Sequence, residues 1–403
     1  MSEGLKLQFK EKPVLSINPP ANKVISGKTA WNLEDFIPNW LDTGVIREIT
    51  IPIPLHFSIL FMRLKKNGKK RPIIDLSELN KMLYFPSFKM ETVAVISNTI
   101  TGELWACSID IKDAYFHVPI NWEFHKFLAF KVKNRVFVFQ FLPFGLSPAP
   151  WAFTRVIRPV KKRLHSVGQI IFSFIDDFIL FAKSPEELSK AAEAALDLLQ
   201  KLGFSINWEK SNLVPSQNVE FLGVDWDLKD RTLSVPLEKR QEIVRRCTMA
   251  LNRDCMTRRE MECLVGKMNF ASAYIQLGRM HLLPLLAWMN LRSSAFSRDR
   301  PVQLDAQFKK RLMPWLDWEF LGRAVSLEQV PPSQTLMTDA SLDGWCGVLL
   351  PHKTVGSWSQ DMIHHSMNWK ELMRCSCPCG ASGLCWWGKA SECSRTAQQQ
   401  SVV

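Results

Sequence analysis

Residues 170–182 read Ile-Ile-Phe-Ser-Phe-Ile-Asp-Asp-Phe-Ile-Leu-Phe-Ala, two apolar runs on either side of Asp176 and Asp177. This pattern predicts a strand, an acidic corner and a second strand. Burying unpaired carboxylates costs several kcal/mol each. We therefore interpret the corner as a place that presents the two acids. A plain hairpin with an acidic turn is the alternative, since Asp is common in turns.

A third carboxylate lies near the end of another apolar stretch. Residues 104–111 predict a buried strand that carries Asp110. Carboxylates that converge from two strands offer only oxygen ligands, which suit Mg²⁺ or Mn²⁺. Two such ions can activate a 3′-hydroxyl and neutralise a leaving pyrophosphate. Asp110, Asp176 and Asp177 are thus candidate ligands of a two-metal site.

The rest of the chain mixes hairpins with helices. A hairpin around Asn67-Gly68 is expected, because this dipeptide is a strong turn signal. Further strands and helices are expected at 127–132, 135–141, 148–165, 184–202, 204–207 and 219–226. From 236 onward the pattern turns helical, at 238–252, 257–275, 279–292 and 308–320, before a new strand at 336–338. Hairpins without regular βαβ units indicate the α+β class.

The excess of basic over acidic residues indicates which kind of partner the protein binds. Of 403 residues, 51 are Lys or Arg and 39 are Asp or Glu, which gives a formal net charge of +12. This excess favours a polyanion, nucleic acid before an acidic membrane surface. A basic protein without such a partner is the alternative. Residues 63–71 hold six basic side chains, which either contact phosphate or form a solvated turn.

Neither a secretory leader nor a membrane span is expected. The first residues are followed by no apolar region, and no run of 18 uncharged apolar residues occurs. We expect an intracellular protein, in the cytoplasm, the nucleus or both, with reduced thiols. Five of the ten cysteines fall in the last 29 residues, with spacing unlike the common zinc motifs. A zinc site and a tail foreign to the fold are both open interpretations.

Six segments, in this order, resemble the motifs of reverse transcriptases, especially those of gypsy-type and DIRS-type retrotransposons. They are 69–80, 108–119, 142–150, 174–177, 202–211 and 221–224. The resemblance runs from about Leu41 to Asn290. It implies a right-hand polymerase with fingers, a palm built on an antiparallel sheet, and a thumb, which copies RNA and then DNA into DNA. One departure is Phe174, where the family usually has Tyr.

The resemblance also implies a division of the chain. We expect an N-terminal extension over residues 1–45 and reverse transcriptase fingers and palm over 46–235. A mostly helical thumb and connection follows over 236–330, and an incomplete ribonuclease H-like α/β segment over 331–403. On the first thumb helix, basic residues either track phosphates or form a solvated face; they are Lys239, Arg240, Arg245 and Arg246.

Roles of single residues follow from the resemblance. Asp110, Asp176 and Asp177 would hold two Mg²⁺ or Mn²⁺ ions, and Lys210 would donate a proton to pyrophosphate. Tyr115 would lie under the sugar and exclude a 2′-hydroxyl. The other residues implied in nucleotide binding are Lys65, Lys66, Lys69, Arg71, Asp113, Ala114, Phe144 and Gly145. The implied partners are an RNA and DNA primer-template and deoxynucleoside triphosphates, with no membrane; the oligomeric state is open.

A second acidic motif follows. Residues 337–348 resemble the first strand of ribonuclease H, with Asp339 as a metal ligand, and 364–372 resemble the next motif, with Glu371. No Asp follows Glu371, and only about 32 residues remain. We expect this site to be vestigial and the chain to lack ribonuclease H activity. The expected function is RNA-directed DNA polymerase of a retroelement; the alternative is a catalytically inactive nucleic-acid-binding relic.

Overall fold

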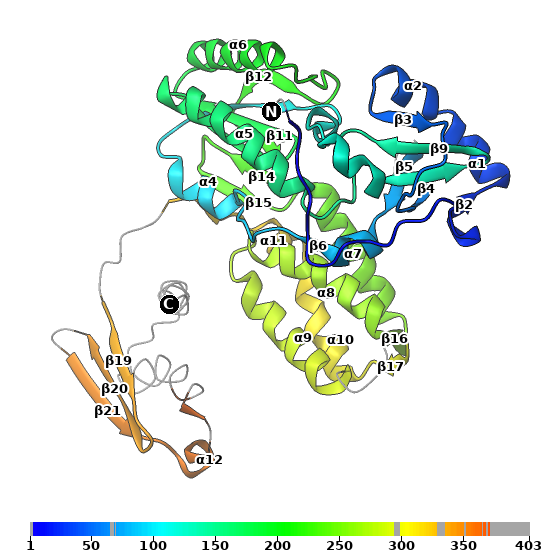
Figure 1. Ribbon diagram of the computed structural model, residues 1–403. Helices are drawn as coiled ribbons and strands as arrows, with labels where there is room; N and C mark the ends of the chain where they lie inside the picture. The colour runs from blue at the N-terminus through cyan, green and yellow to red at the C-terminus, as the bar shows by residue number, and fades with distance from the viewer. Residues whose placement is uncertain are drawn as a thin grey trace. The chain divides into compact units, whose positions relative to one another are not determined.

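The computed structural model describes residues 3–64, 68, 70–293, 299–328, 335–349, 352–364, 366–367 and 370 (Figure 1). The chain divides into two compact units, Met1–Pro236 and Leu237–Val403. The four expected segments stay predictions. Among the described residues, no helix is both long and apolar enough to cross a membrane.

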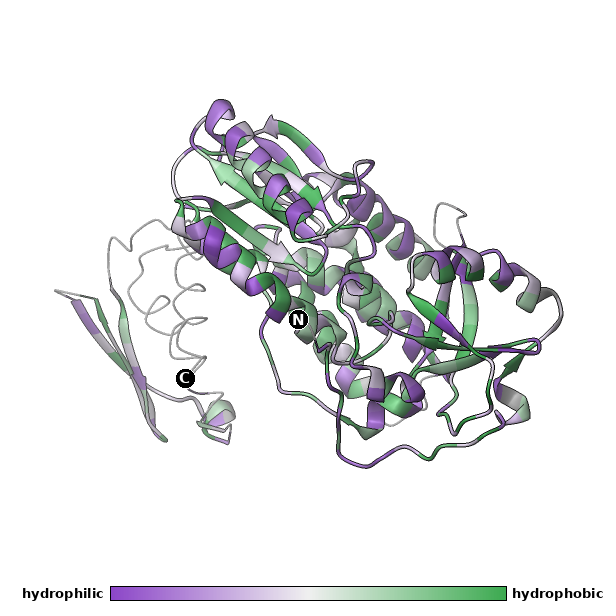
Figure 2. Ribbon diagram, turned by 45° about the horizontal axis from the view of Figure 1, so that its top comes forward, coloured by the Kyte–Doolittle hydropathy of each residue, from purple (hydrophilic) through white to green (hydrophobic). Residues whose placement is uncertain are grey.

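The central sheet of the first unit has four antiparallel strands in the order β10-β11-β7-β12. They are β7 (Trp105–Asp110), β10 (Ile170–Phe174), β11 (Asp177–Ala182) and β12 (Asn212–Ser216). Two long helices, α5 (Ala149–Ser166) and α6 (Pro185–Lys201), pack on this sheet. The apolar side of α6 is buried, and Ser184 caps it by accepting the N–H of Glu187 (3.2 Å). In Figure 2 both long helices mix hydrophilic and hydrophobic residues, as expected for helices that cover a sheet.

A second four-stranded sheet, in the order β2-β8-β9-β3, lies in the same unit. Its strands are β2 (Val24–Ile25), β3 (Ile46–Ile49), β8 (Ala129–Val132) and β9 (Arg135–Phe139). The expected hairpin of β4 (Ile59–Leu64) and β5 (Lys70–Asp75) is present, with Leu64 opposite Lys70. The other elements of this part are η1 (Ala21–Lys23), α1 (Gly27–Glu34), α2 (Ile37–Asp42), α3 (Ser77–Met82), α4 (Val93–Thr99), η2 (Ala114–His117) and η3 (Trp122–Phe127).

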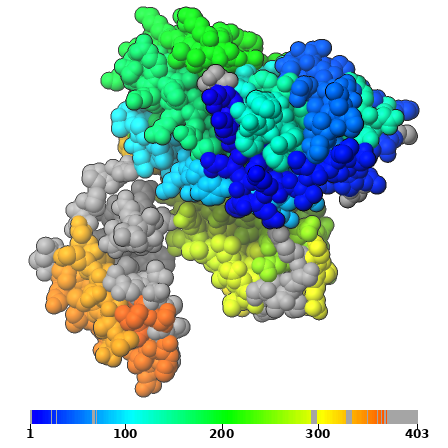
Figure 3. Space-filling view, in the orientation of Figure 1, coloured from blue at the N-terminus to red at the C-terminus, as the bar shows by residue number. Residues whose placement is uncertain are grey.

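The N-terminal residues run over the surface of the first unit as an extended segment (Figure 3, dark blue). Strand β1 (Gln8–Phe9) pairs with β6 (Leu83–Tyr84). Leu5 donates its N–H to the carbonyl of Pro119 (2.8 Å) and accepts that of Asn121 (3.0 Å). These bonds fix the segment to the chain that follows η2.

Two strand predictions near the end of this unit were wrong. Residues 219–226 form two strands of a meander, β13 (Asn218–Phe221) and β14 (Val224–Asp227), followed by β15 (Thr232–Ser234). The turn between the first two has positive φ at both Leu222 (+53°) and Gly223 (+71°), as a two-residue hairpin turn of type I′ requires. Residues 204–207 contain a single bridge, Ile206 to Ile111, instead of a strand.

The second unit begins with the helices α7 (Leu237–Leu251), α8 (Arg258–Ser272) and α9 (Gly278–Ser293), all close to their expected bounds. Strands β16 (Cys255–Thr257) and β17 (Pro301–Gln303) pair. The single helix expected at 308–320 is wrong: the chain forms α10 (Ala306–Leu312), η4 (Met313–Leu316) and α11 (Trp318–Gly322). Pro314 lacks the N–H that a continuous helix needs, and Asp317 caps α11. The two-residue strand β18 is Val325–Ser326.

A small antiparallel sheet in the order β19-β20-β21 follows. Its strands are β19 (Met337–Ala340), β20 (Gly344–Leu349) and β21 (His352–Ser357), and α12 (Gln360–Ile363) comes after them. The new strand expected from 336–338 is therefore present. Glu371 and the cysteines after it lie outside the described residues.

Candidate active site

The β10–β11 hairpin places the acidic pair. Phe174 pairs with Asp177, which leaves Ile175 and Asp176 as a two-residue turn. Ile175 has φ +56°, a left-handed conformation that is rare for a β-branched residue. Such a conformation costs roughly 1–3 kcal/mol and persists only where surrounding structure enforces it. Here the strands on both sides enforce it, and the turn holds the two acids at the end of the sheet.

Strand register then brings the third acid beside them. Asp177 lies directly opposite Asp110 in the β11–β7 ladder. Burial, the negative charges of Asp176 and Asp110, and a hydrogen bond with Asp110 raise the pKa of Asp177 to about 7. Burial first, and then the charge of Asp110, also raise the pKa of Asp176. The predicted convergence of these carboxylates from two strands is therefore present.

Asp110 is held by the loop that precedes β12. Its carboxylate, 7% exposed, accepts from Asn207 Nδ2 at Oδ1 (2.7 Å) and from Lys210 Nζ at Oδ2 (3.2 Å). Its backbone N–H donates to Ser211 Oγ (3.0 Å), and its carbonyl accepts the N–H of Asn207 (2.8 Å). The sequence reasoning found Lys210 but missed Asn207 and Ser211. The only indication of these two residues in the sequence is that both are small and polar and that they lie four positions apart, on either side of Lys210.

The donor set suits a divalent cation. Within the described residues, no three His, Cys, Asp or Glu side chains form a closed metal-binding cluster. Asp110 and Asp177 are neighbours across the ladder, and the charge of Asp176 acts on Asp177. The atoms they offer are all oxygens, and burial together with the neighbouring negative charges raises the pKa values of Asp176 and Asp177. A hard cation such as Mg²⁺ fits that chemistry.

The expected nucleotide-binding residues gather next to the acids. The guanidinium of Arg71 lies 4.3 Å from the ring centroid of Phe144, and the rings of Tyr115 and Phe144 are 5.1 Å apart. Burial, followed by the charge of Asp176, raises the pKa of Tyr115 to about 12, with Arg71 acting in the opposite direction. A cation, two aromatic rings and a carboxylate thus share one place in the palm. Lys65, Lys66 and Lys69 lie outside the described residues.

Asn80 holds the loop that carries Phe144. Its Nδ2 donates to the carbonyl of Gly145, and its Oδ1 accepts the N–H of Ser147, both at 2.8 Å. Gly145 has φ +101°, and a Cβ there would lie 3.1 Å from the carbonyl oxygen of Ile74. Only glycine fits this backbone without strain. Asn80 was part of a recognised motif, but no role was predicted for it.

A histidine connects the Tyr115 segment to the loop around Asp110. Asp113 (φ +49°) and the buried Ala114 lead into η2, which ends at His117. Ser205 donates its N–H to His117 Nε2 (3.0 Å), so the ring proton is assigned to Nδ1, facing the carbonyl of Ala114 (3.3 Å). Burial lowers the pKa of His117, which keeps the ring neutral and able to accept. Triphosphate binding by the backbone of Asp113 and Ala114 stays a prediction.

On the first helix of the second unit, the expected phosphate-tracking residues have partners within the protein. Arg245 and Arg246 both pair with Glu242 (2.8 and 2.6 Å). Lys239 lies over Phe270 and Arg240 over Trp318, at 4.5 and 5.6 Å from the ring centroids. These contacts leave less charge available for phosphates than the sequence suggested.

The second acidic motif is only partly described. Asp339 is exposed on β19, opposite Cys346 of β20. Its expected partner, Glu371, lies outside the described residues. Neither a vestigial site nor the absence of ribonuclease H activity is tested by this geometry, and both stay predictions.

Comparison with known sequences finds a family model that matches the central region. Residues 64–226 match the family described as "Reverse transcriptase (RNA-dependent DNA polymerase)". Relatives include the enzymatic polyprotein of soybean chlorotic mottle virus, 26% identical over 226 residues (55% of this chain, 32% of the relative). Another is the retrovirus-related Pol polyprotein from transposon opus of Drosophila melanogaster, 26% identical over 193 residues (47% and 19%).

Protein P of duck hepatitis B virus (strain China) is 26% identical over 171 residues, which cover 41% of this chain and 22% of the relative. The matched regions therefore span less than half the length of each of these relatives. Residues 64–226 are thus similar to reverse transcriptases, and the similar proteins come from viruses and a retrotransposon. The gypsy-type or DIRS-type assignment stays a prediction.

Solved structures agree on the fold. The foamy viral protease-reverse transcriptase dRH in complex with dsDNA superposes with a TM-score of 0.66 at 18% identity, covering 94% of this chain and 66% of that chain. The same viral protein with an RNA/DNA hybrid gives 0.65, covering 91% and 49%. The fold is thus that of a right-hand polymerase, as expected from the sequence.

Proposed function

We propose that this chain is an RNA-directed DNA polymerase of a retroelement, which adds deoxynucleotides to a primer 3′-hydroxyl. The observation that carries the proposal is the register of the palm sheet, which sets Asp177 opposite Asp110 and leaves Asp176 in the adjoining turn. The reverse transcriptase match over residues 64–226 supports it. The foamy viral relatives of the fold were solved with dsDNA and with an RNA/DNA hybrid, which supports a primer-template as the partner.

Asp110, Asp176 and Asp177 would hold two Mg²⁺ or Mn²⁺ ions. Such ions lower the pKa of a bound hydroxyl and neutralise the charge that develops on transferred phosphates. Before an ion binds, Lys210 and Asn207 neutralise and orient Asp110. Lys210, which keeps a 63% exposed side chain, is free to turn toward a leaving pyrophosphate and give it a proton.

The nucleotide would lie against the cluster of Arg71, Phe144 and Tyr115. Arg71 offers a planar fork of donors to the triphosphate oxygens, and the ring beneath it fixes its orientation. Tyr115, only 7% exposed and packed against Phe144 and Phe153, presents a rigid wall where the sugar sits. A rigid aromatic wall discriminates against an additional 2′-hydroxyl.

Extension of a labelled DNA primer on an RNA template tests the proposal. With the full chain, Mg²⁺ and all four deoxynucleoside triphosphates, we expect stepwise products up to the template end. The matched variant is Asp176→Asn, which removes one charge but keeps the size of the side chain. No extension by the unaltered chain with either Mg²⁺ or Mn²⁺ would favour the alternative of an inactive nucleic-acid-binding relic.

A further inference from the structure

A cavity in the second unit lies between α9 and the segment formed by α10 and η4. It has a volume of about 430 Å³. Pro284, inside α9, and Pro314, in η4, both line it. Proline has no N–H to donate, so each of these residues removes one backbone hydrogen-bond donor beside the cavity, Pro284 within the continuous helix α9 and Pro314 at the start of η4. The space is within the usual range for a small-ligand pocket, about 300–1,000 Å³.

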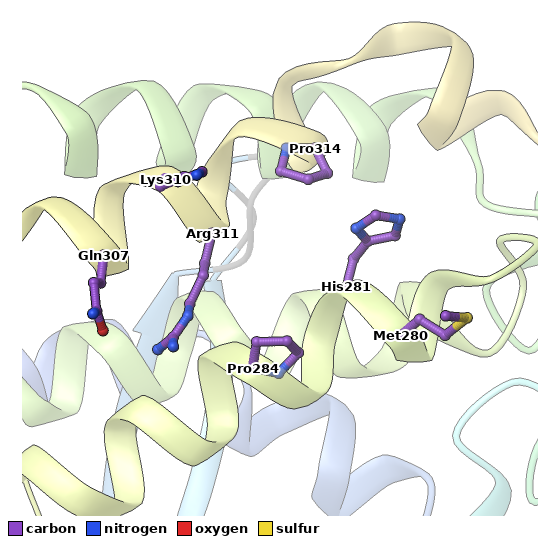
Figure 4. Close-up of a pocket in the computed structure, with 7 residues that line it drawn as sticks. All are labelled: Met280, His281, Pro284, Gln307, Lys310, Arg311 and Pro314. Carbon is purple, nitrogen blue, oxygen red and sulfur yellow. The ribbon is translucent and has the colours of Figure 1, made fainter. Parts of the chain in front are cut away.

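The polar lining of this cavity is basic or neutral. Lys310 and Arg311 of α10 line it together with Gln307 and, from α9, His281. Figure 4 shows Arg311 extending from α10 toward α9 beside Gln307, with His281 on α9. None of the described residues that line the cavity is acidic. Within the part of the chain that the structure describes, neither Lys310 nor Arg311 forms an ion pair.

A second cavity in the same unit offers a contrast. The second cavity, about 190 Å³, is lined by Arg245, Arg246 and Arg253. There, Arg253 pairs with Glu260 (2.9 Å), and both other arginines pair with Glu242. Carboxylates therefore pair with the arginines of the second cavity, whereas Lys310 and Arg311 form no ion pair with a described residue.

We propose that the cavity between α9 and α10 binds a phosphate group of a ligand the size of a single nucleotide. Arg311 supplies a planar fork that matches two phosphate oxygens, and Lys310 supplies a second, compact charge. Met280, Pro284 and Pro314 give the cavity an apolar portion for the rest of the ligand. This site is separate from the palm carboxylates and does not depend on polymerase chemistry.

The phosphate has two possible sources, a free mononucleotide or a nucleic-acid backbone, and the experiment separates them. The full chain is titrated in EDTA with AMP, with adenosine and with a 20-base-pair DNA duplex. The test variant is Lys310→Gln/Arg311→Gln. The control is Arg253→Gln/Lys309→Gln, which also removes one Arg and one Lys, but two whose acidic partners are Glu260 and Asp254.

We expect the test variant to lose at least about tenfold in affinity for the phosphate-bearing probe, and the control to stay within about twofold. Adenosine, which lacks phosphate, is expected to bind much more weakly than AMP. A loss seen with AMP identifies a free nucleotide as the source, and a loss seen with the duplex alone identifies a backbone phosphate. Equal affinities of the test and control variants for both probes would overturn the proposal.

The palm provides a separate readout. The difference in AMP affinity between the test and control variants is expected whether or not the unaltered chain extends a primer, because no palm carboxylate lines this cavity. Failure of the pocket and failure of the polymerase assignment are therefore distinguishable. Melting temperatures of both double variants show whether either has lost its fold.

Discussion

The palm sheet and the β19–β21 sheet each carry an aspartate on an antiparallel strand, but the residues that surround the two aspartates differ. Asp110 of β7 is 7% exposed and lies opposite Asp177, a second carboxylate. Asp339 of β19 is exposed and lies opposite Cys346. Four hydrogen bonds from or to the 207–211 loop fix Asp110.

The difference indicates that the register of the strands, rather than the presence of an aspartate, decides whether two carboxylates lie close enough to bind one metal ion. In the palm, burial and the neighbouring negative charges raise the pKa values of Asp176 and Asp177, and a divalent cation would favour their ionised forms. Asp339 is exposed and faces a cysteine rather than a second carboxylate across its ladder. The first sheet therefore brings together the aspartates proposed as metal ligands, and the described residues of the second include one of its two expected ligands.

The largest effect is expected from Asp176→Asn. Removing one metal-binding charge should reduce nucleotide incorporation at least about a hundredfold. Affinity for primer-template should change by less than about threefold, because the binding energy comes mainly from contacts of basic side chains with the phosphates of the nucleic acid. Single-turnover incorporation and a binding titration measure the two effects. The control, Asp339→Asn, should incorporate nucleotides at the unaltered rate, and a similar loss in both variants would break the comparison.

Tyr115→Ala should relax the choice of sugar. Without the ring, use of ribonucleotides relative to deoxynucleotides should rise about tenfold or more, measured as a ratio of kcat/KM values. Tyr115→Phe keeps the wall and should keep the discrimination. The melting temperature of the Ala variant reports on lost packing against Phe144 and Phe153. An unchanged ratio in a folded Ala variant would mean that Tyr115 only fills the core.

Asn207→Leu should weaken the support of Asp110. It leaves a buried carboxylate oxygen without its donor, which costs about 1–3 kcal/mol in the free energy of unfolding. Denaturant titration measures this loss, and incorporation should fall with it. Asn212→Leu, at an exposed position on β12, is the matched control and should stay within about 0.5 kcal/mol. Equal stability of the two variants would show that the loop does not hold Asp110.

The smallest effect concerns pH. Because the folded-state pKa of Asp177 is about 7, above the usual unfolded value near 3.9, the folded protein binds the extra proton between those values. The contribution of this group to stability is therefore full below about pH 4 and is lost as pH rises through about 7. In EDTA, Asp177→Asn should melt at a higher temperature than the unaltered chain at pH 8.

That gain should shrink toward pH 5, where the unaltered carboxyl is itself protonated. Adding Mg²⁺ at pH 8 should raise the melting temperature of the unaltered chain more than that of Asp177→Asn. A lower melting temperature for the variant at pH 8 would contradict the raised pKa.

Much of the palm could be predicted because its signals are local. Two apolar runs around an acidic pair indicate a hairpin without any knowledge of the fold, and Asn67-Gly68 indicates another. The break in the helix expected at 308–320 could also have been predicted, because Pro314 lies inside that range and proline disrupts a helix. The turn at Leu222-Gly223 was missed because the strands on both sides are only four residues long.

The support of the site could not be predicted because its contacts are distant in sequence. Asn207 and Ser211 lie 97 and 101 positions from Asp110, and Asn80 lies 65 positions from Gly145. No local pattern records such hydrogen bonds. The left-handed Ile175 contradicts the local preference of its residue type, and only the strands on both sides of the turn impose it.

Binding of Mn²⁺, followed by the electron paramagnetic resonance signal of the free ion, tests most directly whether the palm register makes the metal centre. The unaltered chain, Asp110→Asn and Asp339→Asn are titrated side by side at pH 8. We predict that the unaltered chain and Asp339→Asn deplete free Mn²⁺ equally, and that Asp110→Asn loses at least about tenfold in affinity. Undiminished binding by Asp110→Asn, or loss of binding in Asp339→Asn alone, would contradict the account.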